Sequence, residues 1–218
     1  MFDKVEKSEN SIFDEEINVS GWDAITNVFN ELYPKQKEPK HYGTIISYRL
    51  GGNDPLDGIS IYDGGDYWHF ITYGMSELYE KESENGDISG FGMEFTFKLA
   101  KADYEDEEAE ISCLCGILQA IARLSYSNGE VFNAYEYLYT GQKEGIDIKQ
   151  KSNITGFITI SDPCLKTIST PNGSVAFVEF IGVTDTELVA IMNNEISVKD
   201  LYDILQSDVT TYFRQSVI

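Results

Sequence analysis

Apolar residues recur at helical spacing in several segments of the chain. The clearest is residues 111–124, where the apolar positions fall on one stripe and Gly129 supplies a C-terminal stop. An earlier helix is expected to begin at Ser20, whose hydroxyl can cap it. Two short helices are expected near the end of the chain, after the capping-box sequence at residues 184–187 and after Ser197. We predict that residues 111–124 form the central, buried helix.

Between these helices the apolar positions alternate with other residues at a period of two. Such segments, rich in aromatic and β-branched residues, are typical of strands, and they are found at residues 58–62, 67–73, 91–99, 154–160 and 175–183. Residues 63–66 between the first two are suited to a hairpin turn. Because strands and helices do not alternate strictly, the pattern predicts an α+β fold with a mixed, largely antiparallel sheet packed with helices. We expect residues 1–19 to be a polar N-terminal segment and residues 20–218 to be a single domain.

Composition adds a strong charge to this picture. The 218 residues include 16 Lys and Arg against 37 Asp and Glu, which gives a formal net charge of −21. The chain is also 42% hydrophobic and 13% aromatic, which is too apolar for an acidic disordered protein. A nucleic-acid or membrane partner is not expected, because binding to either phosphate-rich surface requires a basic face. The charge therefore indicates a cationic partner.

The acidic residues are concentrated in the first half of the chain. Residues 1–110 hold 25 acids and 9 bases, whereas residues 111–218 hold 12 and 7. The densest run lies just before the predicted central helix. One explanation of this run is the helix dipole, which favours acids at that position. The alternative is that the run is a contact surface for a cationic partner. On that second reading the candidate partner-binding residues are Asp103, Tyr104, Glu105, Asp106, Glu107, Glu108 and Glu110.

Residues suited to catalysis or metal binding are few. His69 lies in an aromatic strand segment, where a hydrogen-bonded structural histidine is expected, and Cys113 and Cys115 are interpreted as small buried apolar residues. The sequence has no zinc-binding spacing, phosphate-binding loop or nucleophile elbow. We therefore expect no catalytic residues, no metal and no cofactor; an enzyme would need a pocket that joins His69 to a carboxylate or thiol. The odd number of cysteines and the lack of a signal peptide or long apolar run favour reduced thiols and a cytoplasmic location.

A series of longer blocks is more specific than any of these short motifs. The first three are LGGNDPLDGISIY at residues 50–62, WHFITYGMSELY at residues 68–79 and SGFGMEFTFKL at residues 89–99. Further blocks follow in order at residues 118–123, 162–163, 170–173 and 180–188, and one precedes them at residues 21–25. Together they resemble the suppressor of fused (SUFU) family, and specifically its short bacterial members, over about residues 20–206.

The resemblance implies a SUFU-like fold and a protein-binding function. Animal members sequester a transcription factor, and bacterial members are often immunity proteins that neutralise a polymorphic toxin, commonly a nuclease. In the animal proteins a partner-contacting tyrosine directly follows the L-A-R motif, where this chain has Leu124. The acidic contact after it falls on Glu136, which joins the candidate residues.

Two functions remain open. The leading hypothesis is a non-enzymatic immunity protein whose acidic surface covers the cationic cleft of a cognate toxin, with exposed tyrosines as anchors. The tyrosines considered for that role are Tyr104, Tyr135, Tyr137 and Tyr139. The alternative is a cytosolic adaptor that binds a peptide or another protein unrelated to toxins.

Overall fold

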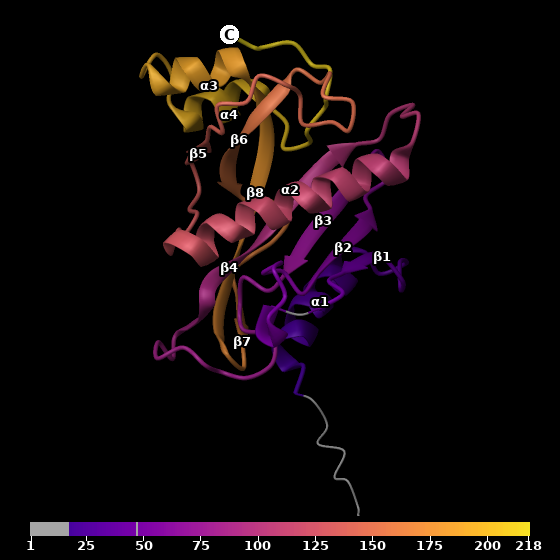
Figure 1. Ribbon diagram of the computed structural model, residues 1–218, viewed down its shortest axis with the longest axis vertical. Coiled ribbons are helices and arrows are strands. Elements are labelled where there is room, and N and C mark those ends of the chain that lie inside the picture. Colours follow the sequence, from indigo (N-terminus) through magenta and orange to yellow (C-terminus); the bar gives the residue numbers. More distant parts are fainter. Residues whose placement is uncertain (1–17, 47) are drawn as a thin grey trace, which may run out of the picture.

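The structure is a computed structural model that describes residues 18–46 and 48–218 (Figure 1). The polar segment predicted for residues 1–19 falls almost wholly outside this range. The helices are α1 (Ser20–Leu32), α2 (Glu107–Asn128), α3 (Asp185–Met192) and α4 (Val198–Leu205), with a 3₁₀ helix η1 (Tyr48–Leu50). The strands are β1 (Lys40–Gly43), β2 (Gly58–Asp63), β3 (Tyr67–Tyr73), β4 (Ile88–Ala100), β5 (Tyr137–Leu138), β6 (Ile154–Ser161), β7 (Ile168–Thr170) and β8 (Gly173–Thr184).

All these strands belong to one sheet. Its order is β1-β2-β3-β4-β8-β6-β5, with β7 paired to β8. Every pair is antiparallel except β4 with β8, so the predicted α+β fold with a largely antiparallel sheet is confirmed. The predicted hairpin between β2 and β3 is also confirmed. Strands β1, β5 and β7 were not predicted, because two to four residues are too short to display a period of two.

The N-termini of the helices show which of the predicted capping residues form caps. Thr184 and Glu187 form the predicted capping box at the start of α3, and Ser197 accepts a hydrogen bond from the amide of Asp200 at 3.1 Å. The prediction that Ser20 caps α1 is wrong. Ser20 lies inside the helix, and its amide donates instead to the side chain of Asn18 at 3.0 Å. The next two amides of α1 donate to the carbonyl oxygen of Leu78, so the first turn is satisfied without the serine hydroxyl.

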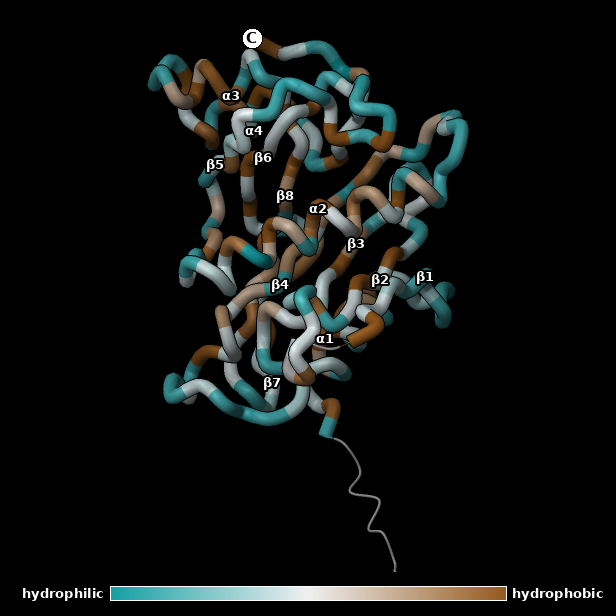
Figure 2. Tube along the Cα trace, viewed as in Figure 1, coloured by the Kyte–Doolittle hydropathy of each residue, from teal (hydrophilic) through white to brown (hydrophobic). Residues whose placement is uncertain are grey.

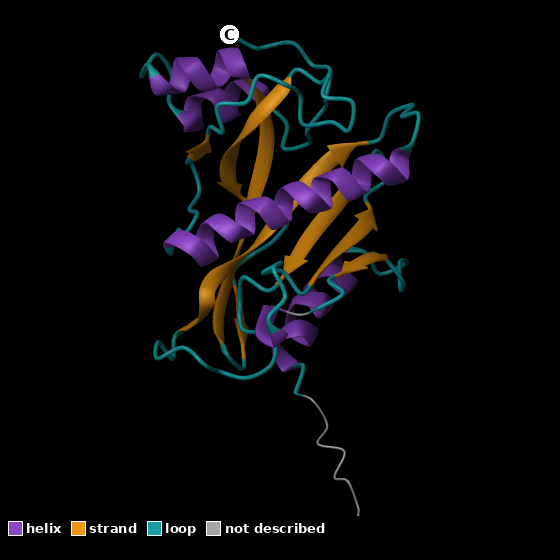
Figure 3. Ribbon diagram, in the orientation of Figure 1, coloured by secondary structure: helices purple, strands orange, loops and turns teal. Residues whose placement is uncertain are grey.

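Helix α2 crosses one face of the sheet (Figure 3). It is the predicted central helix, and it extends beyond residues 111–124 at both ends. Its buried residues Ile111, Leu114 and Leu118 pack in one core with Phe95 and Phe97 of β4. The helix ends at a glycine in the left-handed conformation, as predicted.

Different helices cover the two ends of the opposite face (Figure 1). At one end α1 packs Ile25 and Phe29 into a second apolar cluster, and at the other α3 and α4 pack Leu188 and Leu201 into a third. Figure 2 shows that hydrophobic stretches follow the strands, whereas hydrophilic stretches gather in the connecting loops. Within residues 18–46 and 48–218, no helix is both long and apolar enough to span a bilayer.

Candidate functional site

The acidic run predicted as a contact surface lies at the N-terminal end of α2. Asp106 is the N-cap, and its carboxylate accepts the amide hydrogen of Ala109 at 3.0 Å. Glu107, Glu108 and Glu110 occupy the first turn, where the helix dipole favours negative charge. Part of the run therefore has a structural role, as the dipole reading expects.

Two acids in the run form ion pairs with lysines from distant segments. Glu108 accepts hydrogen bonds from Lys40 at 2.6 Å and from the hydroxyl of Tyr42, which joins β1 to α2. These bonds lower the pKa of Glu108. Glu105 forms an ion pair with Lys149, in the loop that precedes β6. These contacts join remote parts of the chain to the start of α2.

Burial distinguishes the remaining members of the run. The carboxylate of Glu110 is buried and accepts the amide of Ile148 at 3.1 Å, and burial raises its pKa. Tyr104 is half-buried, donates its hydroxyl to the carbonyl of Ala100 at 2.7 Å and has its pKa raised to about 12 by burial. Asp103 is exposed and Glu107 is half-buried, and neither makes an ion pair or side-chain hydrogen bond within the described part of the chain. These two acids are therefore the members of the run whose carboxylates have no partner in residues 18–46 and 48–218.

Glu136 lies beyond the opposite end of α2. Its carboxylate accepts the amide of Asn133 at 2.9 Å, and it borders a hollow of about 500 Å³ together with Leu124. Since α2 has 22 residues and a helix rises about 1.5 Å per residue, its ends are about 33 Å apart. Glu136 and the acidic run therefore do not form one compact site.

Tyrosines project around this hollow. Tyr135 and Tyr137 are 49% and 45% exposed, whereas Tyr139 is half-buried against the core beneath α3 and α4. Tyr135 has a φ of 68°, a left-handed conformation that is uncommon outside glycine. Its amide donates to the carbonyl of Thr159 at 2.7 Å, and the next amide donates to the Thr159 hydroxyl, so β6 holds the strained residue in place. The sequence carries no signal for this backbone geometry.

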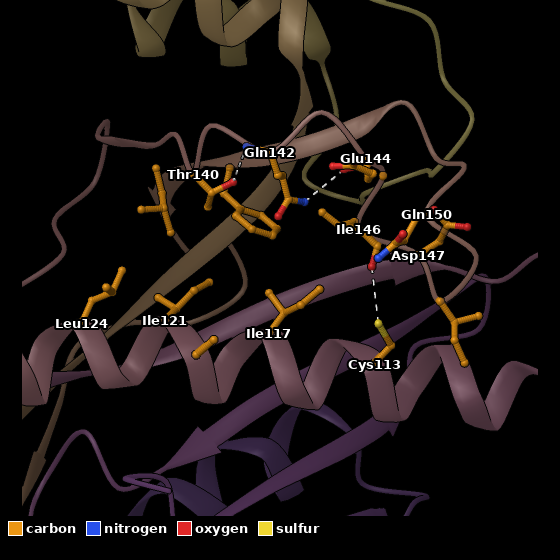
Figure 4. A pocket seen from close by; sticks show the side chains of 15 residues that line it. Cys113, Ile117, Ile121, Leu124, Thr140, Gln142, Glu144, Ile146, Asp147 and Gln150 are labelled. Carbon is orange, nitrogen blue, oxygen red and sulfur yellow. Dashed lines mark hydrogen bonds between the residues drawn. The ribbon is translucent and has the colours of Figure 1, made fainter. Parts of the chain in front are cut away.

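A groove of about 490 Å³ runs beside α2, between these regions (Figure 4). Cys113, Ile117 and Leu124 form its α2 side, and the loop around residues 138–150 forms the other side. The thiol of Cys113 donates to the carbonyl of Ile146 at 3.5 Å. Cys113 is therefore half-buried at the groove, which corrects the prediction that it is simply buried, while Cys115 is buried as predicted. The sequence analysis does not predict the groove, although a second apolar stripe on α2 indicates that this face of the helix is covered in part.

His69 has the structural environment that the sequence suggested. It is fully buried, its Nδ1 lies 2.8 Å from the hydroxyl of Tyr33, and its Nε2 lies 3.1 Å from a carboxylate oxygen of Asp162. Burial lowers the pKa of His69, which favours the neutral ring. The consistent tautomer donates from Nε2 to Asp162 and accepts from Tyr33 at Nδ1. This hydrogen-bonded pair lines neither the groove nor the hollow.

Known proteins share sequence similarity with this chain. A family model described as suppressor of fused protein (SUFU) matches residues 52–215. The chain belongs to the SUFU family. The suppressor of fused homolog of Homo sapiens is 31% identical over 182 residues, which cover 77% of this chain and 36% of the human protein. The chain thus spans about a third of the length of that relative.

Solved SUFU structures share the fold. A chain in the crystal structure of a Sufu–Fu complex superposes with a TM-score of 0.80 and 28% identity, covering 92% of this chain and 93% of that one. The crystal structure of a SUFU homolog from Neisseria gonorrhoeae FA 1090 superposes with a TM-score of 0.55 and 18% identity, covering 91% and 98%. At that identity, the second likeness shows the fold alone.

The SUFU sequence blocks serve mainly to hold this fold together. In the block at residues 50–62, the amide and carbonyl of Leu56 exchange hydrogen bonds with the side chain of Gln119 on α2, at 3.1 and 2.9 Å. In the block at residues 89–99, the buried carboxylate of Glu94 accepts hydrogen bonds from Thr72 and Ser76 of the preceding block. These contacts place the sheet and α2, whereas the groove and the hollow lie along the outer side of α2.

Proposed function

We propose that this SUFU-family chain is a non-enzymatic protein-binding module and, more specifically, a cytoplasmic immunity protein that neutralises a cognate toxin with a basic surface. The observation that carries the proposal is the hollow beyond α2. There the exposed rings of Tyr135 and Tyr137 stand beside Glu136 and the exposed Glu130. Rigid aromatic side chains next to carboxylates suit a cationic protein partner, and a SUFU-family relative crystallised as a Sufu–Fu complex supports a protein partner.

A nuclease is the toxin class that best matches this chemistry. The active cleft of a nuclease is cationic because it binds phosphates. The net charge of −21 would attract such a cleft from a distance and speed association, while the tyrosines would supply the buried contacts that slow dissociation. We extend the proposal to residues 20–218 as the single domain that performs this role.

The experiment is co-expression with the toxin encoded by the adjacent gene, followed by binding measurements at several salt concentrations. Substituting Tyr135 and Tyr137 together by alanine should weaken binding by about 100-fold or more, as expected for central anchors. A toxin that binds the unaltered protein but remains fully active would contradict the immunity role. Failure to bind the neighbouring toxin at all would also contradict the immunity role.

A second set of variants tests the charge. Substituting lysine for Asp103, Glu107 and Glu130 reverses the charge of three acids that make no ion pair within residues 18–46 and 48–218. The matched control places lysine at the exposed acids Asp23, Glu31 and Glu38, which changes the net charge equally on other elements. The first set should slow association about tenfold more than the control. Equal slowing by both sets would mean that the acidic residues act only through net charge.

An adaptor that binds a peptide is the second candidate. It is favoured by β5, which lies at one end of the sheet order and leaves an edge open beside the hollow. An extended peptide can pair with such an edge. Protection of the backbone amides of Tyr137 and Leu138 from hydrogen exchange by a non-toxin ligand would favour this function.

A further inference from the structure

The groove beside α2 lies between the two places where acidic candidates are found. From Cys113 to Leu124 it follows about three turns of helix, or about 16 Å. Leu124 also borders the hollow that contains Glu136, so the groove and the hollow are neighbours at this residue. The acidic run and Glu136 thus lie beyond opposite ends of the groove along α2.

The walls of the groove leave room for another helix. On α2, Ala120 lines the groove and Gly116 is exposed, with open space where a side chain would project. Small residues allow a second helix to approach closely. The opposite wall is fixed in place, because the carboxylate of Asp147 accepts the amides of Lys151 and Ser152. The groove is therefore preformed.

We propose that this groove binds an amphipathic helix of the partner, with apolar residues along its centre and Lys or Arg at both ends. This inference rests on the proposed function, because it assumes a cationic partner. Asp103 and Glu107 stand near one end of α2, and Glu130 and Glu136 near the other. The charged side chains that line the groove itself, Glu144 and Asp147, are acidic as well, and the carboxylate of Asp147 is already engaged by backbone amides. Charge complementarity therefore favours cations on the partner's helix, above all at its two ends.

The test uses two synthetic peptides of about 18 residues with the same leucine stripe, one with lysines at both ends and one with glutamates. Binding is followed by fluorescence anisotropy, and induced helix by circular dichroism. The lysine-ended peptide should bind at least about tenfold more tightly and gain helix on binding. Ala120→Trp, which fills the groove, should weaken this binding by about tenfold or more. The matched control, Asn27→Trp, places the same ring on an exposed position of α1, which covers the opposite face of the sheet, and should have no effect.

A second variant distinguishes a loss of binding from a loss of folding. Leu124→Gln alters a side chain that is already 37% exposed and should also weaken the lysine-ended peptide. Equal binding to the unaltered protein and both groove variants would place the peptide elsewhere on the acidic surface and overturn the inference. No binding, or binding without induced helix, would overturn it as well. These outcomes leave the proposed function standing, because that function fails only if the protein does not bind and inhibit the neighbouring toxin.

Discussion

Strand β4 presents phenylalanines to one side of the sheet and polar residues to the other. Phe95 and Phe97 point into the core beneath α2. Glu94, Thr96 and Lys98 alternate with them and are equally buried, on the side that α1, α3 and α4 cover. The buried interior of the first side is apolar, with hydrogen bonds such as those of Gln119 at its margin. The second side contains a stripe of buried hydrogen-bonded and charged groups between two apolar clusters.

Lys98 is the centre of the polar stripe. Its ammonium lies 2.9 Å from Glu179, 2.7 Å from Asp208 and 3.5 Å from Asp162, and all but Asp208 are buried. Burial raises the pKa of Glu179 well above its usual range. At Asp162, burial also opposes ionisation, but the hydrogen bond from His69 and the charge of Lys98 outweigh it and lower the pKa to about 2. The polar side therefore depends on matched charges, which apolar contact does not require.

Removing the central cation should have the largest effect on stability. Lys98→Met keeps most of the side-chain volume but leaves the buried carboxylates without their ammonium, and we expect it to lower the free energy of unfolding by about 4 kcal/mol. Urea unfolding at pH 7 measures the change. Lys199→Met is the control, because its pair with Asp203 is exposed to solvent and should contribute little to stability. A loss below about 1 kcal/mol at Lys98 would show that the stripe relaxes without its cation.

The apolar side should respond to volume instead of charge. Leu118→Ala removes a fully buried side chain of α2 and should cost about 3 kcal/mol. Because no ionisable group is involved, this loss should be the same at pH 5 and pH 8. A strongly pH-dependent loss would contradict the separation of the two sides.

The contrast explains which parts of the fold are predictable. The capping box at Thr184, the β2–β3 hairpin and the stripe of α2 depend on neighbouring residues, so local patterns reveal them. The alternation in β4 predicts a strand with one polar side, but burial of that side depends on helices from remote segments. Strand β5 likewise exists only through its pairing with β6.

The same limit applies to the candidate site. The acidic run is visible in the sequence, but Lys40 and Lys149 decide which of its acids are engaged, and both come from distant segments. The groove requires the loop at residues 138–150 to lie over α2. The left-handed backbone at Tyr135 is imposed by Thr159 of β6. The contacts of Lys40, Lys149 and Thr159 leave no periodic or motif signal, and only the α2 side of the groove is visible in the sequence as an apolar stripe.

The pH dependence of stability should arise mainly on the polar side. Burial raises the pKa of Glu94 from its ordinary value of 4.5 to about 7, although its carboxylate accepts hydrogen bonds from Thr72, Gly74 and Ser76. Folding thus favours the protonated acid. The corresponding stabilisation is complete below about pH 4.5 and is lost as the pH rises through 7, by at most about 3 kcal/mol.

Glu94→Gln isolates this contribution because glutamine does not titrate. Relative to the variant, the unaltered protein should lose stability between pH 5 and pH 8, as measured by urea unfolding across that range. A constant difference between the two proteins would mean that Glu94 has the same pKa in the folded and unfolded states.

The smallest expected effect is at the cap of the helix that covers the apolar side. Asp106→Ala leaves the amide of Ala109 without its acceptor and should lower the free energy of unfolding by about 1 kcal/mol. Asp103→Ala is the matched control, since Asp103 is exposed three residues earlier in the same acidic run and should change stability by less than about 0.5 kcal/mol. If both substitutions act equally on stability, the run contributes through its summed charge near the helix dipole and not through the cap. If only Asp106→Ala destabilises the protein, Asp103 is free to serve partner binding without a structural role.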